Sequence, residues 1–358
     1  MNRKFYFSFI AVALMIAATF AFVIGNKTGR ASSNSALAAL PASDFIISID
    51  VQRALNETLP SLLSSNPGTL AKFNAHLEEF QQKTGINPRV FESVAIGGSL
   101  NPTLSPGRRD QSTVVIARGS FNSTELLNAG FAAAQKECEF VKEEQQYEGK
   151  TIYLISQVKP LKKSSGENSA RLSQEQYSHH FEVSAASKEK FAITALDANS
   201  IAVGSPESVR AAIDASLGRN RVDEELVQLA SQSTNAAISF SGKIPEGFAE
   251  KNVPNDMIGR YFASIRKFYG SFSANGSDAE TFIALQTEKA EDATRISDAL
   301  NSLKSLAALS FTQSTDKSSR NNSFSDLLKG VSVTAEGNEV KISVKFQPGN
   351  IGPFVRHF

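Results

Sequence analysis

Two alternating runs decide the fold: Val331-Ser332-Val333-Thr334 and Val340-Lys341-Ile342-Ser343-Val344-Lys345-Phe346. Apolar and polar residues take turns in both, as they do in strands that bury one face. Glu336-Gly337-Asn338 lies between the runs, and glycine supplies the backbone conformation that a tight turn needs. The stretch therefore predicts an antiparallel hairpin.

Earlier parts of the chain repeat this pattern. One hairpin is predicted over residues 138–155, around Tyr147-Glu148-Gly149-Lys150, and another over 191–204, around Asp197-Ala198-Asn199. The first of these shares its Glu-Gly turn with the hairpin near residue 337. Hairpins join antiparallel strands, so the sheet should be mainly antiparallel.

Helices are predicted where apolar residues recur every three or four positions. Residues 67–83 show this spacing, and Gly85 ends the segment. Ser205-Pro206-Glu207 starts another helix with a capping hydroxyl and a proline in the first turn. Asn122, with Glu125 three residues later, caps a third. The expected apolar face of the helix at 67–83 consists of Leu70, Phe73, Leu77 and Phe80. For the helix at 206–217 it consists of Val209, Ile213 and Leu217. For the helix at 292–308 it consists of Ile296, Leu300, Leu303 and Ala307.

The order of elements suggests an internal duplication. Strands are expected at 45–51, 94–98 and 113–117 in the first half, and at 236–240, 269–273 and 281–286 in the second, where a helix is expected at 257–268. We interpret the chain as α+β, with two ferredoxin-like β-α-β-β-α-β repeats over residues 41–218 and 232–350. Residues 159–180 are polar and read as an inserted loop. One continuous sheet is the alternative to two separate domains.

The first thirty residues predict export or membrane insertion. Arg3 and Lys4 precede a run from Phe5 to Gly25 that contains no charged residue. A charge in hydrocarbon costs several kcal/mol, so a run of this length is typical of a segment that enters a membrane. The membrane is therefore the one predicted partner that the sequence identifies, through residues 5–25.

Two readings of this segment stay open. The run has the length of a spanning helix, and residues 1–30 would then be a transmembrane anchor. A cleaved signal peptide needs a small-x-small site, for which Ala36-Leu37-Ala38 is the best candidate. Residues 31–40 read as a tether. The protein is expected in a bacterial cell envelope, either anchored in the inner membrane and facing the periplasm or secreted after cleavage.

Composition narrows the function classes. The formal net charge is +1 and basic residues are not clustered, so no nucleic-acid partner is expected. Hydrophobic residues make up 41% of the chain, which predicts a globular protein. Phenylalanine, with 25 residues, should supply most of the bulky core. Cys138 is the single cysteine, so an intramolecular disulfide is excluded; its acidic neighbours favour a structural thiol over a nucleophile.

No catalytic constellation stands out. The Ser-x-x-Lys spacing occurs at Ser187/Lys190, Ser264/Lys267 and Ser314/Lys317, but a chain this rich in serine and lysine produces such matches by chance. No nucleophile elbow of the Gly-x-Ser-x-Gly type accompanies them. We therefore predict no catalytic residue, and the chain is not expected to be an enzyme.

Metal and cofactor sites are not predicted either. His76 lies on the polar side of an expected helix, while His179 and His357 are isolated. His180 and Glu182 could form a weak surface pair, but solvated residues beside a polar loop explain them better. Gly97-Gly98-Ser99 and Gly204-Ser205-Pro206 lack the spacing of phosphate-binding loops, and helix capping accounts for the second.

Several turns and caps carry a resemblance. Leu40-Pro41-Ala42-Ser43-Asp44, Ala117-Arg118-Gly119-Ser120-Phe121, Tyr147 to Tyr153 and Val203 to Asp214 resemble segments of uncharacterised exported bacterial envelope proteins with repeated α+β units. The likeness covers roughly residues 40–215 and weakens beyond them. It implies an envelope location, and it brings no catalytic residue with it.

The sequence thus favours a non-catalytic envelope protein that acts as a binding or structural module. Its partner would be another envelope protein, a lipid or the cell wall. A carrier of an apolar ligand is the alternative, because phenylalanine-rich faces could line a cavity. A hydrolase is the third and least favoured class.

Overall fold

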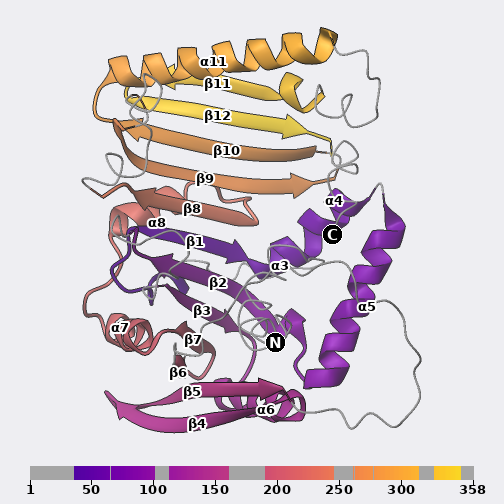
Figure 1. Cartoon of the computed structure of the whole chain (residues 1–358), viewed down its shortest axis with the longest axis vertical. Coiled ribbons are helices and arrows are strands. Elements are labelled where there is room, and N and C mark those ends of the chain that lie inside the picture. The colour runs from indigo at the N-terminus through magenta and orange to yellow at the C-terminus, as the bar shows by residue number, and fades with distance from the viewer. Residues whose placement is uncertain are drawn as a thin grey trace, which may run out of the picture.

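A computed structural model describes residues 36–64, 66–100, 113–160, 190–245, 261, 263–276, 278–313 and 326–347. Twelve strands form one sheet, in the order β11-β12-β10-β9-β8-β1-β2-β3-β7-β6-β5-β4 (Figure 1). Every pairing between neighbouring strands is antiparallel. The prediction of an α+β protein with a mainly antiparallel sheet is confirmed.

The first half of the chain contributes seven strands and most of the described helices. Its strands are β1 (Phe45–Asp50), β2 (Phe91–Gly98), β3 (Val114–Gly119), β4 (Cys138–Tyr147), β5 (Lys150–Pro160), β6 (Phe191–Asp197) and β7 (Ser200–Gly204). Its helical segments are α3 (Val51–Arg53), η2 (Ala54–Thr58), α4 (Leu59–Leu63), α5 (Pro67–Thr84), η3 (Pro88–Val90), α6 (Ser123–Glu137), α7 (Pro206–Ser216) and α8 (Glu224–Ala230).

The second half adds five strands and one long helix. These are β8 (Ile238–Lys243), β9 (Ile265–Asn275), β10 (Asp278–Thr287), α11 (Ala290–Gln313), β11 (Val331–Glu336) and β12 (Glu339–Phe346). β1 and β8 lie side by side at the middle of the sheet, so the two halves share one hydrogen-bonded layer. The sequence left open whether the halves form two separate domains or one continuous sheet, and the described residues form one continuous sheet.

Five strands of each half follow the same pattern. The order β1-β2-β3-β7-β6 runs outward from the centre on one side, and β8-β9-β10-β12-β11 runs outward on the other. α6 follows β3 as α11 follows β10. The hairpin β4–β5 is an addition to the first half. The ferredoxin-like form of the repeats is not confirmed, because such a unit keeps its first two strands parallel and apart, whereas β1 and β2 are antiparallel neighbours.

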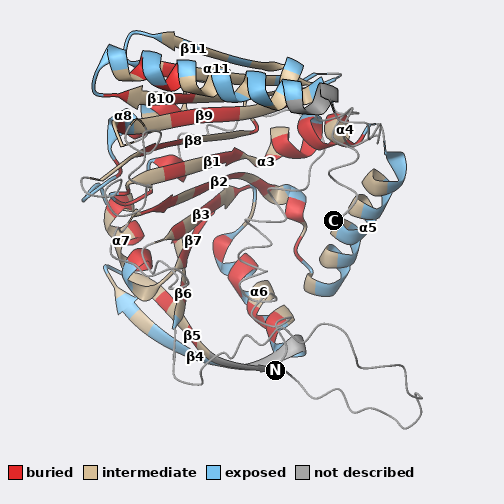
Figure 2. Cartoon of the chain, turned by 45° about the horizontal axis from the view of Figure 1, so that its top comes forward, coloured by how far each residue is buried: buried red, intermediate tan, exposed pale blue. Residues whose placement is uncertain are grey.

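Helices cover the two faces of the sheet unequally (Figure 2). α7 and α8 pack on one face, here the first face, over a buried cluster that includes Ile46, Ile116 and Ile213. α3 to α6 pack on the opposite, second face, over a cluster that includes Ile49, Val94 and Phe131. β1 buries residues on both faces, as its continuous apolar run predicts.

The register places α11 on the second face as well. Ile47, which packs under α3 to α6, is in line across the sheet with Phe240, Gly270, Ile283 and Ile342. Paired residues point to the same face, and Ile342 packs against the cluster of α11. α3–α6 and α11 therefore cover the same face at different ends of the strand order.

Most predicted elements are found close to their predicted limits. Gly85 ends α5 with φ 72°, a left-handed conformation that glycine adopts readily. Asn122 Oδ1 accepts from the N–H groups of Thr124 and Glu125, which confirms the cap of α6. Ser205 Oγ likewise accepts from Ser208 N at 3.1 Å at the start of α7.

Three predicted boundaries are wrong. Ile265 to Phe268 belong to β9 and not to the helix predicted over 257–268, because β-branched Ile265 and aromatic Phe268 favour a strand there. Residues 257–260 lie outside the described part. β5 runs to Pro160, so the polar insertion begins later than 159. Residues 36–40 are not tether, since Ala36, Leu37 and Leu40 are buried under the first face.

Candidate functional site

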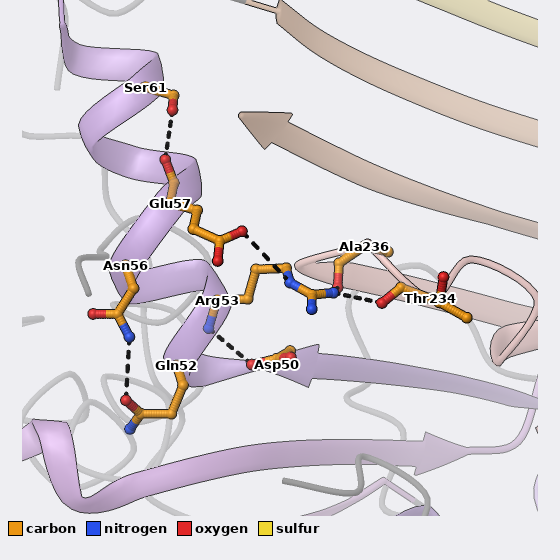
Figure 3. A network of polar contacts seen from close by, with 8 residues as sticks. All are labelled: Asp50, Gln52, Arg53, Asn56, Glu57, Ser61, Thr234 and Ala236. Carbon is orange, nitrogen blue, oxygen red and sulfur yellow. Dashed lines mark hydrogen bonds and ion pairs between the residues drawn. The ribbon is translucent and has the colours of Figure 1, made fainter. Parts of the chain in front are cut away.

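Polar side chains gather where β1 turns into a helical segment (Figure 3). Asp50 ends the strand, and its Oδ1 accepts a hydrogen bond of 2.8 Å from the backbone N–H of Arg53. An aspartate at this position is a favourable cap, because its carboxylate satisfies an N–H group that has no acceptor inside the helix. The cap fixes the first helical turn against the end of the strand.

Arg53 links this turn to the second half of the chain. Its Nη1 donates to the carbonyl oxygen of Thr234 at 2.6 Å and to that of Ala236 at 3.5 Å. Its Nε lies 3.7 Å from Glu57 Oε2. The planar guanidinium suits this arrangement, because its donors point along several fixed directions at once. Arg53 thus joins the corner after β1 to the segment that leads into β8.

The next turn, η2, is π-helical and contains two buried polar residues. Asn56 Nδ2 donates to Gln52 Oε1 at 3.2 Å, and Gln52 Nε2 donates to the carbonyl oxygens of Arg89 and Phe91. Among the described residues, Asn56 Oδ1 and Thr58 Oγ1 are buried without a hydrogen-bond partner. Wide helical turns and unsatisfied buried polar atoms both occur often at functional positions.

Burial changes the acidity of the corner. Desolvation raises the pKa of Asp50 above its ordinary value of 3.8, while the N–H and the charge of Arg53 oppose the shift. A raised carboxyl pKa is common where a group exchanges protons. Here, however, Oδ1 is engaged by the helix backbone, so the carboxyl group acts as a cap. The corner can hold the end of β1 and the segment before β8 together. The Asp50 carboxyl group is engaged in capping and is not placed to transfer a proton.

A second polar cluster lies on the first face of the second half. Tyr269 Oη is 3.2 Å and 3.3 Å from the two carboxylate oxygens of Glu339, and Gln286 Nε2 donates to Glu339 Oε1 at 2.8 Å. Burial and the charge of Glu339 raise the pKa of Tyr269 to about 12. The phenol therefore remains protonated at neutral pH and serves as a hydrogen-bond donor between β9 and β12.

One shallow pocket of about 320 Å³ lies between α6 and the strands β5 and β6. Lys150, Thr151 and Asp197 are among the residues that line it. Asp197 Oδ2 is 3.6 Å from Arg118 Nη1, so its charge is partly compensated. The size is at the lower limit for small-molecule sites. Its opposite charges would suit a small polar molecule, but they do not form an acid–base pair with a nucleophile.

The serine–lysine spacings do not form catalytic pairs in the described residues. Ser264 Oγ donates to the carbonyl oxygen of Tyr261 at 2.7 Å, while Lys267 forms an ion pair with Glu225. Lys190 Nζ lies 2.6 Å from Glu143 Oε2. Ser187, Ser314 and Lys317 lie outside the described residues.

The histidines and the cysteine hold no described site. His76 is exposed on α5, with Nδ1 3.5 Å from Glu79 Oε2, as expected for the polar side of that helix. Cys138 begins β4. His179, His180, Glu182 and His357 fall outside the described residues. Within the described ranges, no three His, Cys, Asp or Glu side chains are grouped to hold a metal ion.

The corner at 50–61 and the Tyr269 cluster were not singled out in the sequence. Asp50 and Arg53 have the spacing of a cap, which was available as a signal, but the acceptors at Thr234 and Ala236 are far away along the chain.

As for membrane insertion, no helix within the described residues is both long and apolar enough to span a bilayer. The run from Phe5 to Gly25 lies outside those residues.

Comparison with known proteins gives no family. No known family matches the sequence, and no curated protein matches it. Among solved structures, crystal form III of TP0453 is 10% identical with a TM-score of 0.46, covering 90% of this chain and 98% of that one. Crystal form I of TP0453 is 8% identical with a TM-score of 0.41, covering 89% and 96%. Likeness at this level says nothing about activity.

Proposed function

We propose that this chain is an exported or membrane-anchored protein of a bacterial envelope, and that it acts as a binding or structural module and not as an enzyme. The run from Phe5 to Gly25 carries the proposal, because it contains no charge over a length that can span the hydrocarbon core. A large α+β domain follows it, and the polar corner of that domain is used to hold its two halves together.

Alkaline extraction of membranes from a bacterium that expresses the full chain tests this location. An anchored protein stays in the pellet, whereas a cleaved one is released with a new N-terminus that mass spectrometry can identify. Lys4→Glu with Arg3→Glu should reduce insertion, because the positive residues before the run orient it. An intact N-terminus in the soluble cytosolic fraction would contradict both forms of the proposal.

A second candidate, a carrier of an apolar ligand, is favoured by one feature of α5. The helix contacts chiefly α4 and α6, and none of its residues is buried, although Leu70, Phe73, Leu77 and Phe80 pack on the second-face cluster. Ile47, Ile96 and Val115 of the sheet are only half-buried on that side. An apolar chain inserted between helix and sheet would remove this surface from water.

Binding of a fluorescent long-chain fatty acid would test the carrier function. Phe73→Glu should abolish binding because it places a charge on the apolar side of α5, while Ala75→Glu on the exposed side should leave binding unchanged. Equal loss in both variants, or no binding by the unmodified chain, would exclude a carrier.

We also propose that the two halves arose by duplication of one α+β unit. The support is the shared outward strand order from β1 and from β8, together with the equivalent positions of α6 and α11. The limits 41–218 and 232–350 remain a prediction. The hairpin β4–β5 is then an insertion that belongs to the first unit alone.

A further inference from the structure

The sheet ends in two outermost strands, β11 and β4, and α11 protects the first of them. The carbonyl groups of Val331 and Val333 point away from β12, because these two residues form non-hydrogen-bonded pairs of that ladder. Lys304 Nζ of α11 donates to the carbonyl oxygen of Val331, and Asn301 Nδ2 donates to that of Val333 at 3.2 Å. Covering an edge with a helix is one way in which proteins prevent further strand pairing.

The register of the hairpin β4–β5 determines which groups lie on the edge at the other end of the sheet. Its two turn residues have φ of 49° and 72°, as a two-residue type I′ turn requires. In such a hairpin Tyr147 and Lys150, which flank the turn, exchange hydrogen bonds, and every second pair after them does the same. The Thr151 carbonyl oxygen lies between two such pairs and accepts from Thr194 Oγ1 of β6 at 2.8 Å, so it points away from β4.

The outer edge of β4 consequently presents backbone groups that can pair with another strand. Lys142, Glu144 and Gln146 lie between the hydrogen-bonded pairs, so their N–H and C=O groups point away from β5. Figure 1 shows β4 at the end of the sheet, and within the described ranges no strand pairs with this edge. An edge of this kind is a template for a further strand.

The charges on this edge alternate in sign. Lys142 and Glu144 lie two positions apart, hence on the same face of the sheet, and Lys142 Nζ is 3.2 Å from Glu144 Oε1. Lys142 Nζ also lies 4.8 Å from the centroid of the Tyr153 ring, a contact that attracts the ammonium toward the strand. Such an edge repels most strands but matches one that carries the same two charges in reverse order.

A second copy of β4, running antiparallel to the first, presents this reverse order. A two-fold axis beside Glu143 places Lys142 of each chain opposite Glu144 of the other. The same two residues carry the outward N–H and C=O groups, so the charges and the backbone hydrogen bonds are satisfied in one register. We infer that two copies of this chain associate through their β4 strands in this register, which joins the two sheets edge to edge.

The other registers that satisfy the backbone place like charges together. An axis beside Glu144 would set the two Glu144 carboxylates against each other, and one beside Lys142 would do the same with the two ammonium groups. In the register inferred here the two Glu143 side chains are opposed on the first face. Lys190 Nζ lies 2.6 Å from Glu143 Oε2 within each chain, which compensates that charge.

Disulfide trapping in cells that express the full chain tests the register. In a Cys138→Ser background, Glu143→Cys places one thiol of each chain beside the axis, where opposed Cα atoms are about 4.5 Å apart and a disulfide can form. Gln145→Cys is the matched control on the same face of β4, because the axis separates its two thiols by more than about 13 Å.

Glu143→Cys should link two copies at least roughly tenfold faster than Gln145→Cys, because pairing raises the effective concentration of the opposed thiols. Peptide mass spectrometry identifies the linked residues. Equal rates for the two variants would overturn the inference. A disulfide from position 143 to a different protein would overturn it as well, and would assign the edge to that partner.

Charge reversal gives a cysteine-free test that also excludes association through residues 5–25. Lys142→Glu and Glu144→Lys should each raise the dissociation constant of the full-chain dimer in detergent at least roughly tenfold, because each sets like charges together at two symmetric positions. The double variant, Lys142→Glu with Glu144→Lys, restores opposite charges and should recover association. Sedimentation measures the constants, and circular dichroism checks the fold. A monomeric natural chain, unchanged association in the single variants, or no recovery in the double variant would overturn the inference.

Discussion

Arg53 Nη1 donates a hydrogen bond of 2.6 Å to the carbonyl oxygen of Thr234, across 181 positions of sequence. The bond connects the helical corner after β1 with the segment before β8. Asp50 strengthens the same junction through its backbone, whose N–H donates to the carbonyl oxygen of Ala237 at 2.9 Å. The two halves are thus held together by side-chain bonds at the end of β1 as well as by the β1–β8 ladder.

Arg53→Met should destabilise the protein by about 1–3 kcal/mol, because it leaves the carbonyl of Ala236 partly buried without its donor and removes the partner of Glu57. Arg53→Lys should lose less, since it keeps one donor and the charge. Urea unfolding followed by circular dichroism measures the change. Arg295→Met, on an exposed side chain, is the control. A change in Arg53→Met no larger than in the control would contradict the role assigned to the junction.

Asp50→Asn should remove a pH dependence of stability. The folded pKa of Asp50 is raised, so this group stabilises the fold below its unfolded value of 3.8 and that contribution is lost as pH rises through the folded pKa. Asparagine keeps the capping oxygen without the charge. The variant should therefore gain stability relative to the natural chain between acidic and neutral pH.

Asp50→Ala is the matched comparison for this titration. It loses the cap as well as the charge, and a lost cap costs about 1 kcal/mol at every pH. Urea midpoints for the three chains, measured from pH 3 upward in ~1-unit steps, give the comparison. A constant difference between Asp50→Asn and the natural chain over the range would show that Asp50 titrates normally.

Local patterns predicted much of the fold. The cap at Ser205, the turn at Gly85 and the hairpin around Gly149 depend on residues close together in sequence, and each was found. The helix expected up to Phe268 failed because pairing with β8 and β10 decides the state of Ile265 to Phe268. Local spacing contains no information about such partners.

The candidate site was harder to predict for the same reason. The role of Arg53 depends on its hydrogen bond to Thr234, and that of Tyr269 depends on its hydrogen bond to Glu339. Both partners are distant in sequence, so the local pattern around Arg53 or Tyr269 does not reveal them. The ferredoxin-like form was inferred from element order, which does not specify whether β1 and β2 run parallel. They are antiparallel neighbours.

Tyr269 should ionise at a higher pH than an ordinary tyrosine. Its pKa of about 12 lies above the ordinary value of 10, so the group stabilises the fold below pH 10 and loses that contribution as the pH rises toward 12. Glu339→Gln keeps an acceptor but removes the negative charge, and should lower the pKa of Tyr269. Phenolate absorbance during alkaline titration, with Tyr269→Phe to assign the signal, measures both values. An unchanged late titration in Tyr269→Phe would assign it to another tyrosine.

Two glycines should respond in opposite directions to the same change. A Cβ on Gly119 would overlap the carbonyl oxygen of Val90, where β2 and β3 approach closely, whereas a Cβ on Gly130 in the middle of α6 would meet nothing within 4 Å. Gly119→Ala should therefore destabilise by about 1–3 kcal/mol through forced backbone shifts. Gly130→Ala should stabilise by about 0.5–1 kcal/mol, because alanine favours a helix over glycine. Thermal unfolding followed by circular dichroism gives both signs, and a stabilised Gly119→Ala would show that β2 and β3 lie farther apart at this position.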